Sequence, residues 1–354
     1  MDINALMEVA YSRGASDMHL SVGRRPVLRV GGGLVEIGDA ALTPADTEAM
    51  GKQLAPERNW DELVKTGTTD FGYAFGDKCR FRVSILTQKG TRGVVMRQIP
   101  QKLLSFDQIG LPESVHDLLN LHRGLVLVTG PTGSGKTTTL ATMIDWINRN
   151  RDVHIITIED PVEYYHTHQK SQVTQREVGN DVTSFAEAMR RALRQDPDVI
   201  LLGEMRDLET TSAAITAAET GHLVFGTLHT TGAARTVDRI IDQYPREQQE
   251  QIRSQLAVSL VAVISQILIP TADGGRVAAF EVMLTSPAIE NHIRKCETFK
   301  IPSVIQTSRR QGMVLMDDFL LDLYRGGRID KETALERSFD RKALLLRMGG
   351  GGAE

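Results

Sequence analysis

The sequence predicts an α/β protein in which a small N-terminal α/β domain precedes a larger P-loop domain with a helical C-terminal portion. The length of 354 residues fits two domains, at roughly 150 residues per domain. From residue 125 onward, short apolar runs alternate with helical segments, which is typical of parallel strands joined by crossover helices. A complete phosphate-binding loop lies between one such run and the helix after it.

Residues 1–99 show the pattern of a small α/β domain. A helix is expected over Ile3–Ser12, because its apolar residues fall on one face. A second helix is expected over Leu42–Leu54, where Thr43 and Pro44 provide an N-cap and a proline in the first turn. Expected strands are two short ones within Pro26–Ile37, around the turn Gly31–Gly33, and three longer ones at Thr69–Phe75, Arg80–Leu86 and Gly93–Ile99. An interdomain linker is predicted over 100–113.

The second domain is predicted over 114–285. Its expected strands are Leu125–Thr129, His154–Ile158, Val199–Leu202 and Leu223–Thr227, and its expected helices are Lys136–Asn148, Ser184–Arg194 and Thr210–Thr220. Ser184 and Glu187 have the spacing of a capping box, and Gly221 is expected just beyond the end of its helix. A helical region should follow over 286–348, and the glycine-rich tail 349–354 is expected to be disordered.

The composition limits the classes of function. Hydrophobic residues make up 41% and charged residues 24%, as in an ordinary globular protein. A net charge of −4 and only 5% aromatic residues disfavour nucleic acid as a partner. Cys79 and Cys296 lie far apart, which excludes a disulfide framework or a cysteine zinc site and indicates a reducing compartment.

Neither the N-terminal stretch nor the uncharged stretch Ser254–Ala272 predicts a membrane segment. The N-terminus lacks the apolar core of a signal peptide. Ser254–Ala272 is uncharged but contains serine, glutamine and proline, so a buried helix running into a strand is expected there instead of a membrane span. The sequence therefore predicts a cytoplasmic protein.

The strongest functional motif is the loop from Gly130 to Thr137, which matches the P-loop pattern in full and has the required strand before it and helix after it. Its glycines let backbone N–H groups surround phosphate oxygens. Lys136 supplies a cation for the β- and γ-phosphates, and the Thr137 hydroxyl coordinates Mg²⁺. The predicted nucleotide-binding residues are Gly130, Pro131, Thr132, Gly133, Ser134, Gly135, Lys136, Thr137 and Thr138.

A P-loop enzyme also needs acids for the metal ion and for the attacking water. The apolar strand Val199–Leu202 delivers Glu204 to its carboxyl end, with Gly203 where an aspartate is usual. A second acidic group, Glu159, Asp160 and Glu163, follows another strand. A solvated acidic loop is the alternative interpretation of this second group.

Histidines and arginines supply further candidates. His222 and His229 lie at the two ends of one strand, and His229, at the carboxyl end, suits a γ-phosphate sensor, although a lone histidine is more often structural. Alternation places Arg80 and Arg82 on the exposed face of a strand, and Arg97 ends the neighbouring run. Their guanidinium groups suit contact with a phosphate bound by a partner subunit. The alternative interpretation is that they form a solvated strand face without a functional role.

Taken together, these motifs resemble those of the type IV pilus retraction ATPases (PilT type) within the secretion/pilus ATPase superfamily. The resemblance runs from about Gly14 to Arg328. Besides the P-loop it rests on Ser16–Leu20, the acidic box Ile158–Glu163, Gln175–Gly179, the stretch Asp196–Asp207 and the histidine box that begins at Ala217.

The resemblance implies roles for these residues beyond the reasoning from spacing. Glu163 would be the general base or water orienter, and Glu204 the Mg²⁺-linked acid. His229, with His222, would monitor the γ-phosphate. Arg82 and Arg97, and Arg80 as a further candidate, would reach the ATP of a neighbouring subunit.

The resemblance also implies an architecture and partners. The N-terminal domain would be PAS-like and the second RecA-like. A homohexamer using ATP and Mg²⁺ would dock on an inner-membrane pilus platform protein, at the cytoplasmic face of the membrane and without nucleic acid.

One segment departs from the family. The family has the C-terminal motif A-I-R-N-L-I-R-E. In this chain, Ala288–Lys295 matches that motif at five of eight positions and differs at Glu290, His292 and Lys295. The spacing of Glu290 and Lys295 does not favour a strong ion pair within one helix. This departure leaves open an accessory paralogue of the retraction motor.

Other rivals are less well supported by the sequence. An assembly or secretion ATPase commonly carries a further N-terminal domain and a four-cysteine insert, and neither feature is found in this sequence. A nucleic acid translocase is disfavoured by the net charge and the few aromatic residues. An ATP-binding scaffold that does not hydrolyse ATP is disfavoured by Lys136, Glu163 and Glu204.

Overall fold

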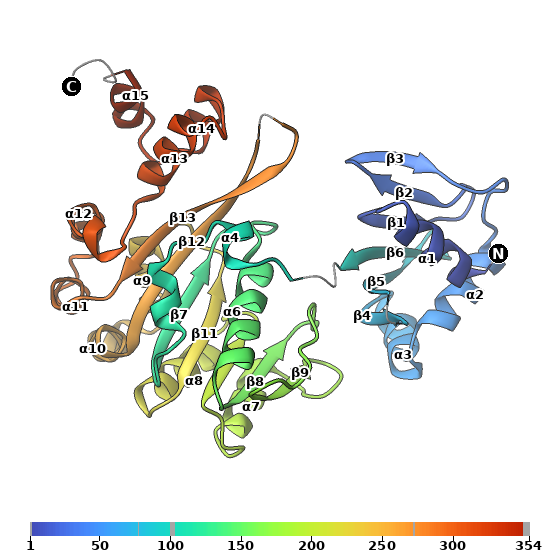
Figure 1. Ribbon diagram of the computed structural model, residues 1–354. Coiled ribbons are helices and arrows are strands. Elements are labelled where there is room, and N and C mark those ends of the chain that lie inside the picture. The colour runs from blue at the N-terminus through green and yellow to red at the C-terminus, as the bar shows by residue number, and fades with distance from the viewer. Residues whose placement is uncertain (1, 77, 100–102, 272, 350–354) are drawn as a thin grey trace. The chain divides into compact units, whose positions relative to one another are not determined.

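The structure, a computed structural model, describes residues 2–76, 78–99, 103–271 and 273–349. The chain forms two compact units, which can be followed by colour in Figure 1. The first comprises Met1–Leu103 and Pro161–Tyr165, and the second comprises Leu104–Asp160 and His166–Glu354. The short segment 161–165 therefore groups with the first unit, although its neighbours in sequence belong to the second.

The first unit is built on one six-stranded antiparallel sheet of order β3-β2-β1-β6-β5-β4. Its strands are β1 (Asp17–Leu20), β2 (Val27–Val30), β3 (Gly33–Glu36), β4 (Thr68–Phe75), β5 (Cys79–Gln88) and β6 (Thr91–Ile99), and its helices are α1 (Ile3–Ser12), α2 (Pro44–Leu54) and α3 (Glu57–Thr66). Thr43 caps α2 in a capping box with Asp46. Ile3, Leu6, Met7 and Ala10 of α1 are buried in the same core as the sheet residues, which confirms the predicted apolar face of that helix.

The second unit contains a seven-stranded sheet of order β13-β12-β7-β11-β10-β8-β9. Its strands are β7 (Gly124–Thr129), β8 (His154–Glu159), β9 (Gln172–Glu177), β10 (Val199–Leu202), β11 (Leu223–Leu228), β12 (Leu260–Pro270) and β13 (Arg276–Leu284). All neighbours are parallel except β12 and β13, which pair antiparallel. The four predicted strands and their parallel arrangement are confirmed, and the unit is RecA-like.

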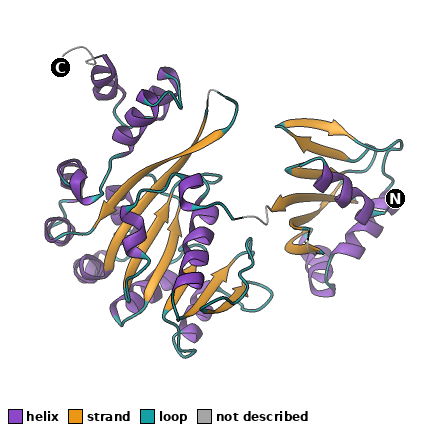
Figure 2. Ribbon diagram, in the orientation of Figure 1, coloured by secondary structure: helices purple, strands orange, loops and turns teal. Residues whose placement is uncertain are grey.

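Helices cover both faces of this sheet, as Figure 2 shows. They include α4 (Phe106–Ile109), α5 (Ser114–Leu118), α6 (Lys136–Asn150), α7 (Phe185–Ala192), α8 (Leu208–Glu219), α9 (Ala233–Ile241) and α10 (Gln249–Ser259). Leu125 and Leu127 of β7 pack with α8, α9 and α10, whereas the alternate residues Val126 and Val128 pack with α5 and α6. Burial on both faces explains why these strands are apolar without alternation.

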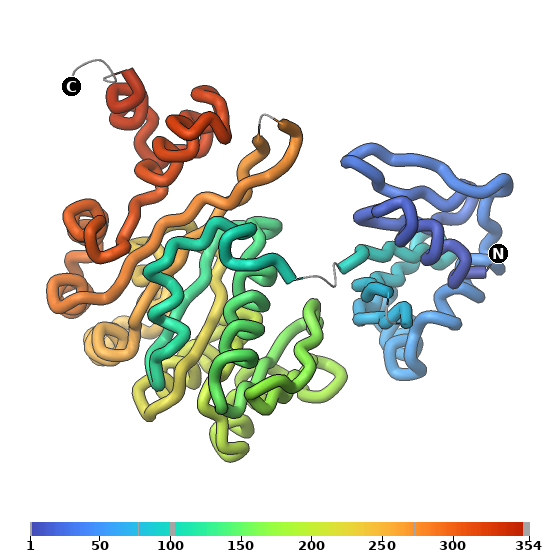
Figure 3. The backbone as a smooth tube through the Cα atoms, in the orientation of Figure 1, coloured from blue at the N-terminus to red at the C-terminus, as the bar shows by residue number. Residues whose placement is uncertain are grey.

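The chain continues from α10 directly into β12, as expected for the stretch that begins at Ser254. After β13 it enters the helical C-terminal portion (Figure 3). Its α-helices are α11 (Pro287–Arg294), α12 (Ile301–Thr307), α13 (Met316–Arg325), α14 (Lys331–Arg337) and α15 (Arg341–Gly349). Helices α13, α14 and α15 form a separate small core with Ile269 of β12 and Ala279 of β13.

Several boundaries differ from those predicted. Helices α4 and α5 belong to the second unit, so this unit begins within the stretch expected to be a linker. Ser184 caps α7, but the Glu187 carboxylate bonds Arg191 at 2.7 Å instead of returning to the cap, and the helix ends at Ala192. Gly349, predicted to begin a disordered tail, is instead the last residue of α15. Residues 100–102 of the predicted linker and 350–354 of the predicted tail lie outside the described residues.

Candidate nucleotide site

The carboxyl ends of three adjacent strands gather the predicted nucleotide-site residues of the second unit. Strands β7, β11 and β10 are neighbours in the sheet, and Gly130, His229 and Glu204 follow them closely. The backbone N–H of Gly130 donates to Leu228 O at 3.3 Å, and that of Met205 donates to Thr227 O at 3.0 Å. These bonds hold the three strand ends together at one edge, where ligands collect in open α/β sheets.

The phosphate loop needs glycine at two positions for steric reasons. A Cβ on Gly130 would lie 2.1 Å from Gln266 O, and a Cβ on Gly135 would lie 2.8 Å from Gln266 Nε2. Both residues also have positive φ, at 142° and 91°. The loop therefore closes against β12 and turns directly into α6 at Lys136.

The remaining loop groups suit a nucleotide phosphate. Lys136 Nζ donates to Gly130 O at 2.7 Å and to Pro131 O at 3.0 Å, which fixes the ammonium at the loop. Burial lowers the pKa of Lys136, and the negative charge of Glu204 opposes that shift. Ser134 Oγ is buried without a hydrogen-bond partner among the described residues, and Thr137 is exposed in the first turn of α6. A buried orphan hydroxyl in a glycine-lined loop at a helix N-terminus fits a phosphate group.

Glu204 lies at the centre of a charged cluster. Its Oε1 accepts from Arg206 Nε at 2.6 Å and interacts with His229 Nε2 at 2.8 Å. Burial would raise the pKa of Glu204, but Arg206 and His229 outweigh it, and the pKa lies below the usual value. Thr227 Oγ1 also donates to Gly203 O at 2.5 Å, which ties the backbone before Glu204 to β11. The carboxylate is thus kept ionised and oriented.

Two residues of this site were not assigned a role from the sequence. Arg206 is an ion-pair partner of Glu204, and Gln266 lies beneath the phosphate loop, where its Oε1 accepts from Thr139 Oγ1 at 2.8 Å. Ser265 and Gln266 are buried polar residues within the otherwise apolar strand β12. Two polar residues within a buried run are the signal that could have identified Gln266, because buried polar groups require specific partners.

The structure separates the two predicted histidines. His229 bonds Glu204, whereas His222 precedes β11 at the opposite end of the strand, seven residues and about 23 Å away at about 3.3 Å per residue. The His222 ring lies 3.0 Å from Ala217 O, at the end of α8. Of the two histidines, only His229 lies beside Glu204, and the role of either at the γ-phosphate stays a prediction.

The acidic box is divided by the fold. Glu159 ends β8 and is 9% exposed, with Thr157 Oγ1 donating to it at 2.7 Å, so this carboxylate is not part of a solvated loop. Asp160 is exposed in the second unit, while Glu163 lies half-buried in the segment 161–165 of the first unit. The role of Glu163 remains a prediction.

The arginines of the first unit differ in exposure. Arg82 of β5 and Arg97 of β6 are exposed and directly opposite each other in the sheet register. Arg97 Nε donates to Asp17 Oδ1 at 2.9 Å, and the Arg97 side chain is 69% exposed. Among the described residues, Arg82 has no ion-pair partner.

The prediction that Arg80 is exposed is wrong. It is 7% exposed, because Nη1 donates to Val162 O at 3.0 Å and the guanidinium lies 3.8 Å from the centre of the Tyr165 ring. Segment 161–165 therefore covers the strand face at Arg80 and leaves Arg82 open.

The described residues contain neither a cluster of metal-binding side chains nor a membrane-spanning helix. No three or more histidine, cysteine or acidic side chains are clustered so as to hold a metal ion by themselves. No helix within the described ranges is both long and apolar enough to cross a bilayer. The lack of such a cluster among the described residues is compatible with Mg²⁺ at a phosphate loop, because Mg²⁺ at such sites takes few protein ligands and relies on phosphate and water oxygens.

Comparison with known proteins shows the family of the chain. Residues 1–298 match the family described as type II/IV secretion system protein. The chain is 46% identical to a type IV pilus retraction ATPase of Pseudomonas aeruginosa, over 96% of this chain and 98% of that protein. It is 45% identical to a twitching motility protein of Neisseria gonorrhoeae, over 90% of this chain and 86% of that protein. A crystal structure of a pilus retraction motor with bound ADP is similar with a TM-score of 0.92 and 45% identity, covering 98% of this chain and 99% of that one.

Proposed function

Because the chain belongs to the type II/IV secretion system protein family, we propose that it is an ATP-hydrolysing motor that powers type IV pilus retraction. The observation that carries this proposal is the joint placement of the phosphate loop, Glu204 and His229 at one sheet edge, in a chain similar over nearly its full length to a retraction ATPase. Such a motor would support twitching motility.

The residues at this edge divide the work of hydrolysis. The loop glycines and Lys136 bind the β- and γ-phosphates, while the Arg206–Glu204–His229 cluster fixes an ionised carboxylate beside them. Mg²⁺, held by the Thr137 hydroxyl and by Glu204, would neutralise developing phosphate charge. His229 would sense the γ-phosphate, and Glu163 would orient the attacking water or accept its proton.

We further propose that six copies form a ring in which Arg82 and Arg97 act on the ATP of a neighbouring subunit. Their exposure on one sheet face, and the absence of an ion-pair partner for Arg82 among the described residues, support this role. The ring would dock on a pilus platform protein at the cytoplasmic face of the inner membrane, without nucleic acid.

The motor function is tested in a deletion strain. We expect excess surface pili without twitching, restored by the intact gene but not by Lys136→Ala, since that variant loses the phosphate cation while keeping its fold. Purified Lys136→Ala should show no ATPase activity. Unchanged turnover would refute the phosphate-loop assignment. Normal twitching in the deletion strain would instead refute the retraction function, or indicate an accessory paralogue.

The action of Arg82 on a neighbour is tested by mixing variants. Arg82→Ala and Lys136→Ala subunits should each be inactive, and mixed rings should recover part of the activity because some interfaces pair an intact loop with an intact arginine. Native mass spectrometry verifies that mixed rings form. If activity is absent at every ratio despite mixed rings, Arg82 does not act across the interface.

A further inference from the structure

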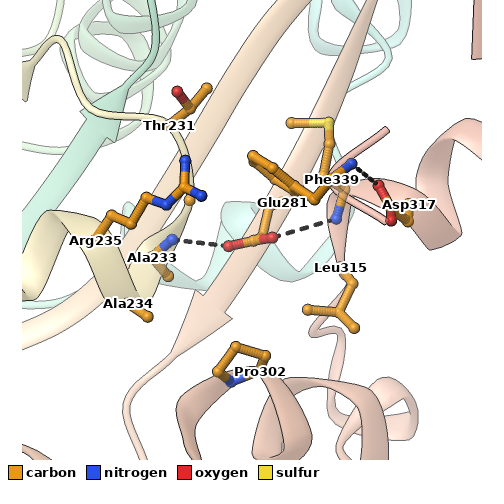
Figure 4. Close-up of a pocket in the computed structure, with 11 residues that line it drawn as sticks. Thr231, Ala233, Ala234, Arg235, Glu281, Pro302, Leu315, Asp317 and Phe339 are labelled. Atoms are coloured by element: carbon orange, nitrogen blue, oxygen red, sulfur yellow. Dashed lines mark hydrogen bonds between the residues drawn. The ribbon is translucent and has the colours of Figure 1, made fainter. Parts of the chain in front are cut away.

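Glu281 is a buried carboxyl group that bonds two helix N-termini from distant parts of the second unit. It lies on β13 and is 6% exposed. Its Oε1 accepts the backbone N–H of Ala233 at 2.7 Å, and its Oε2 accepts that of Met316 at 3.3 Å (Figure 4). Ala233 is the first residue of α9 and Met316 the first of α13, so one side chain joins both helix starts.

One of these helices is connected directly to the nucleotide site. His229, bonded to Glu204, is followed within three residues by Gly232, whose N–H donates to Ser265 Oγ at 2.9 Å. Ser265 and Glu281 are opposite each other in the β12–β13 register, so they hold Gly232 and Ala233 side by side. The segment His229–Ala233 is thus fixed at one end by Glu204 and at the other by Ser265 and Glu281.

The other helix belongs to the C-terminal portion. Helix α13 packs with α14 and α15 in their own small core, and Asp317 in its first turn accepts the N–H groups of Phe339 and Asp340. A shift at the start of α13 would therefore move the C-terminal helices together. The Met316 bond is the longer of the two bonds to Glu281, so it is the weaker link.

The surroundings of Glu281 leave room for such a shift. A cavity of about 310 Å³ lies between the first turn of α9, the start of α13, Pro302 and Phe339. Close-packed cores resist displacement, whereas a cavity allows neighbouring elements to move without overlap. Burial raises the pKa of Glu281 and the two N–H groups oppose that shift, so both bonds favour the charged form.

We propose that Glu281 is a positioning residue that couples the nucleotide-sensing segment His229–Ala233 to α13 and the C-terminal helices. The inference rests on the proposed ATPase function. When the γ-phosphate changes the position of His229, the displacement reaches Ala233, and Glu281 passes it to the N–H of Met316. The C-terminal helices thereby respond to the state of the nucleotide.

The test compares hydrogen–deuterium exchange of α13 amides with ADP and with a non-hydrolysable ATP analogue. In the wild-type protein, we expect exchange at 316–325 to differ between the two nucleotides. In Glu281→Gln the amide oxygen can accept only one of the two N–H groups, so this difference should disappear. Turnover should fall about tenfold while KM for ATP changes by less than about twofold, because binding of nucleotide is not affected. Glu297→Gln is the control and should keep the difference, because the Glu297 carboxylate bonds His292 and Lys300 and not the start of α9 or α13.

A second pair of variants isolates the bond itself. Met316→Pro removes the N–H at the first helical position, where proline is tolerated, and Met316→Ala removes the same side chain but keeps the N–H. The nucleotide-dependent difference should be lost in the proline variant and retained in the alanine variant.

The outcomes separate the coupling from the proposed function. Equal behaviour of the Met316 pair, or a retained difference in Glu281→Gln, would overturn the coupling. Wild-type ATPase activity and twitching, measured alongside, report on the proposed function independently: an active motor whose α13 exchange is the same with both nucleotides refutes the coupling alone.

Discussion

The hydrogen bond between Thr139 and Gln266, beneath the phosphate loop, allows a direct test of how much this buried polar pair stabilises the second unit. Both side chains are almost fully buried, at 0% and 2% exposed, and Thr139 Oγ1 donates to Gln266 Oε1 at 2.8 Å. Thr139→Val keeps the shape of the side chain but leaves a buried amide oxygen without this donor. An unsatisfied buried polar group costs about 1–3 kcal/mol, so the free energy of unfolding of the second unit should fall by that amount.

The double variant tests the reason for this loss. Gln266→Leu removes the acceptor, and combining it with Thr139→Val removes both polar partners at once. Because removing both partners of a buried bond is nearly neutral, the double variant should lose less stability than the sum of the two single variants. The interaction energy from the cycle should be about 0.5–3 kcal/mol.

The assay uses urea unfolding followed by the fluorescence of Trp146, which lies in α6 of the second unit. A Trp60→Phe background removes the one other tryptophan, which lies in the first unit. Thr216→Val is the matched control, because this exposed hydroxyl bonds only within α8 and should change stability by less than about 0.5 kcal/mol. The interpretation is refuted if Thr139→Val behaves like the control or if the two single effects add.

Three further predictions concern catalysis and the C-terminal motif. Glu163→Gln should keep ATP binding and slow hydrolysis about 10²–10⁴-fold; a loss of affinity with unchanged single-turnover chemistry would contradict this role. Arg206→Ala removes a group that lowers the pKa of Glu204, so the acid limb of the kcat–pH profile should move to higher pH; an unmoved limb would show that ionised Glu204 is not required. Glu290→Arg replaces the ion pair of Glu290 with Arg294 by a like-charge pair and should cost about 0.5–1 kcal/mol while altering the ATPase rate or twitching; wild-type rates in a hexamer would make the substitution neutral.

Local patterns were sufficient for much of the fold. The helix Ile3–Ser12, the capped helix at Pro44 and the strand Val199–Leu202 occur as expected, because each is specified by residues within a few positions. The strand β1, of only four residues, was not predicted. It has no apolar run of its own and is stabilised by pairing with β2 and with β6, the latter about 75 residues away in the sequence. Pairing over such separations is not visible in a local window.

The same distinction explains the site. The phosphate loop is a contiguous motif, so its residues and conformation follow from its sequence. The partners of Glu204 do not, because His229 is brought to it by the parallel pairing of β10 and β11. Gln266 is brought under the loop by the pairing of β12 with β7. Spacing identified Glu204 as an acid at a strand end, but its ionisation depends on neighbours that only the sheet supplies.

Arg80 and Arg82 show how a distant segment changes the meaning of a local pattern. Alternation correctly places both on one face of β5, and on that basis they are equivalent candidates for contact with a neighbouring ATP. The segment 161–165 then covers Arg80, which is bonded to Val162 O, the carbonyl immediately before Glu163. A buried arginine bonded to the backbone of its own chain is not free to enter another subunit, whereas Arg82 keeps its donors exposed. The two arginines therefore have different environments: Arg80 bonds the segment that carries Glu163, whereas Arg82 is exposed and remains the candidate for action across the interface.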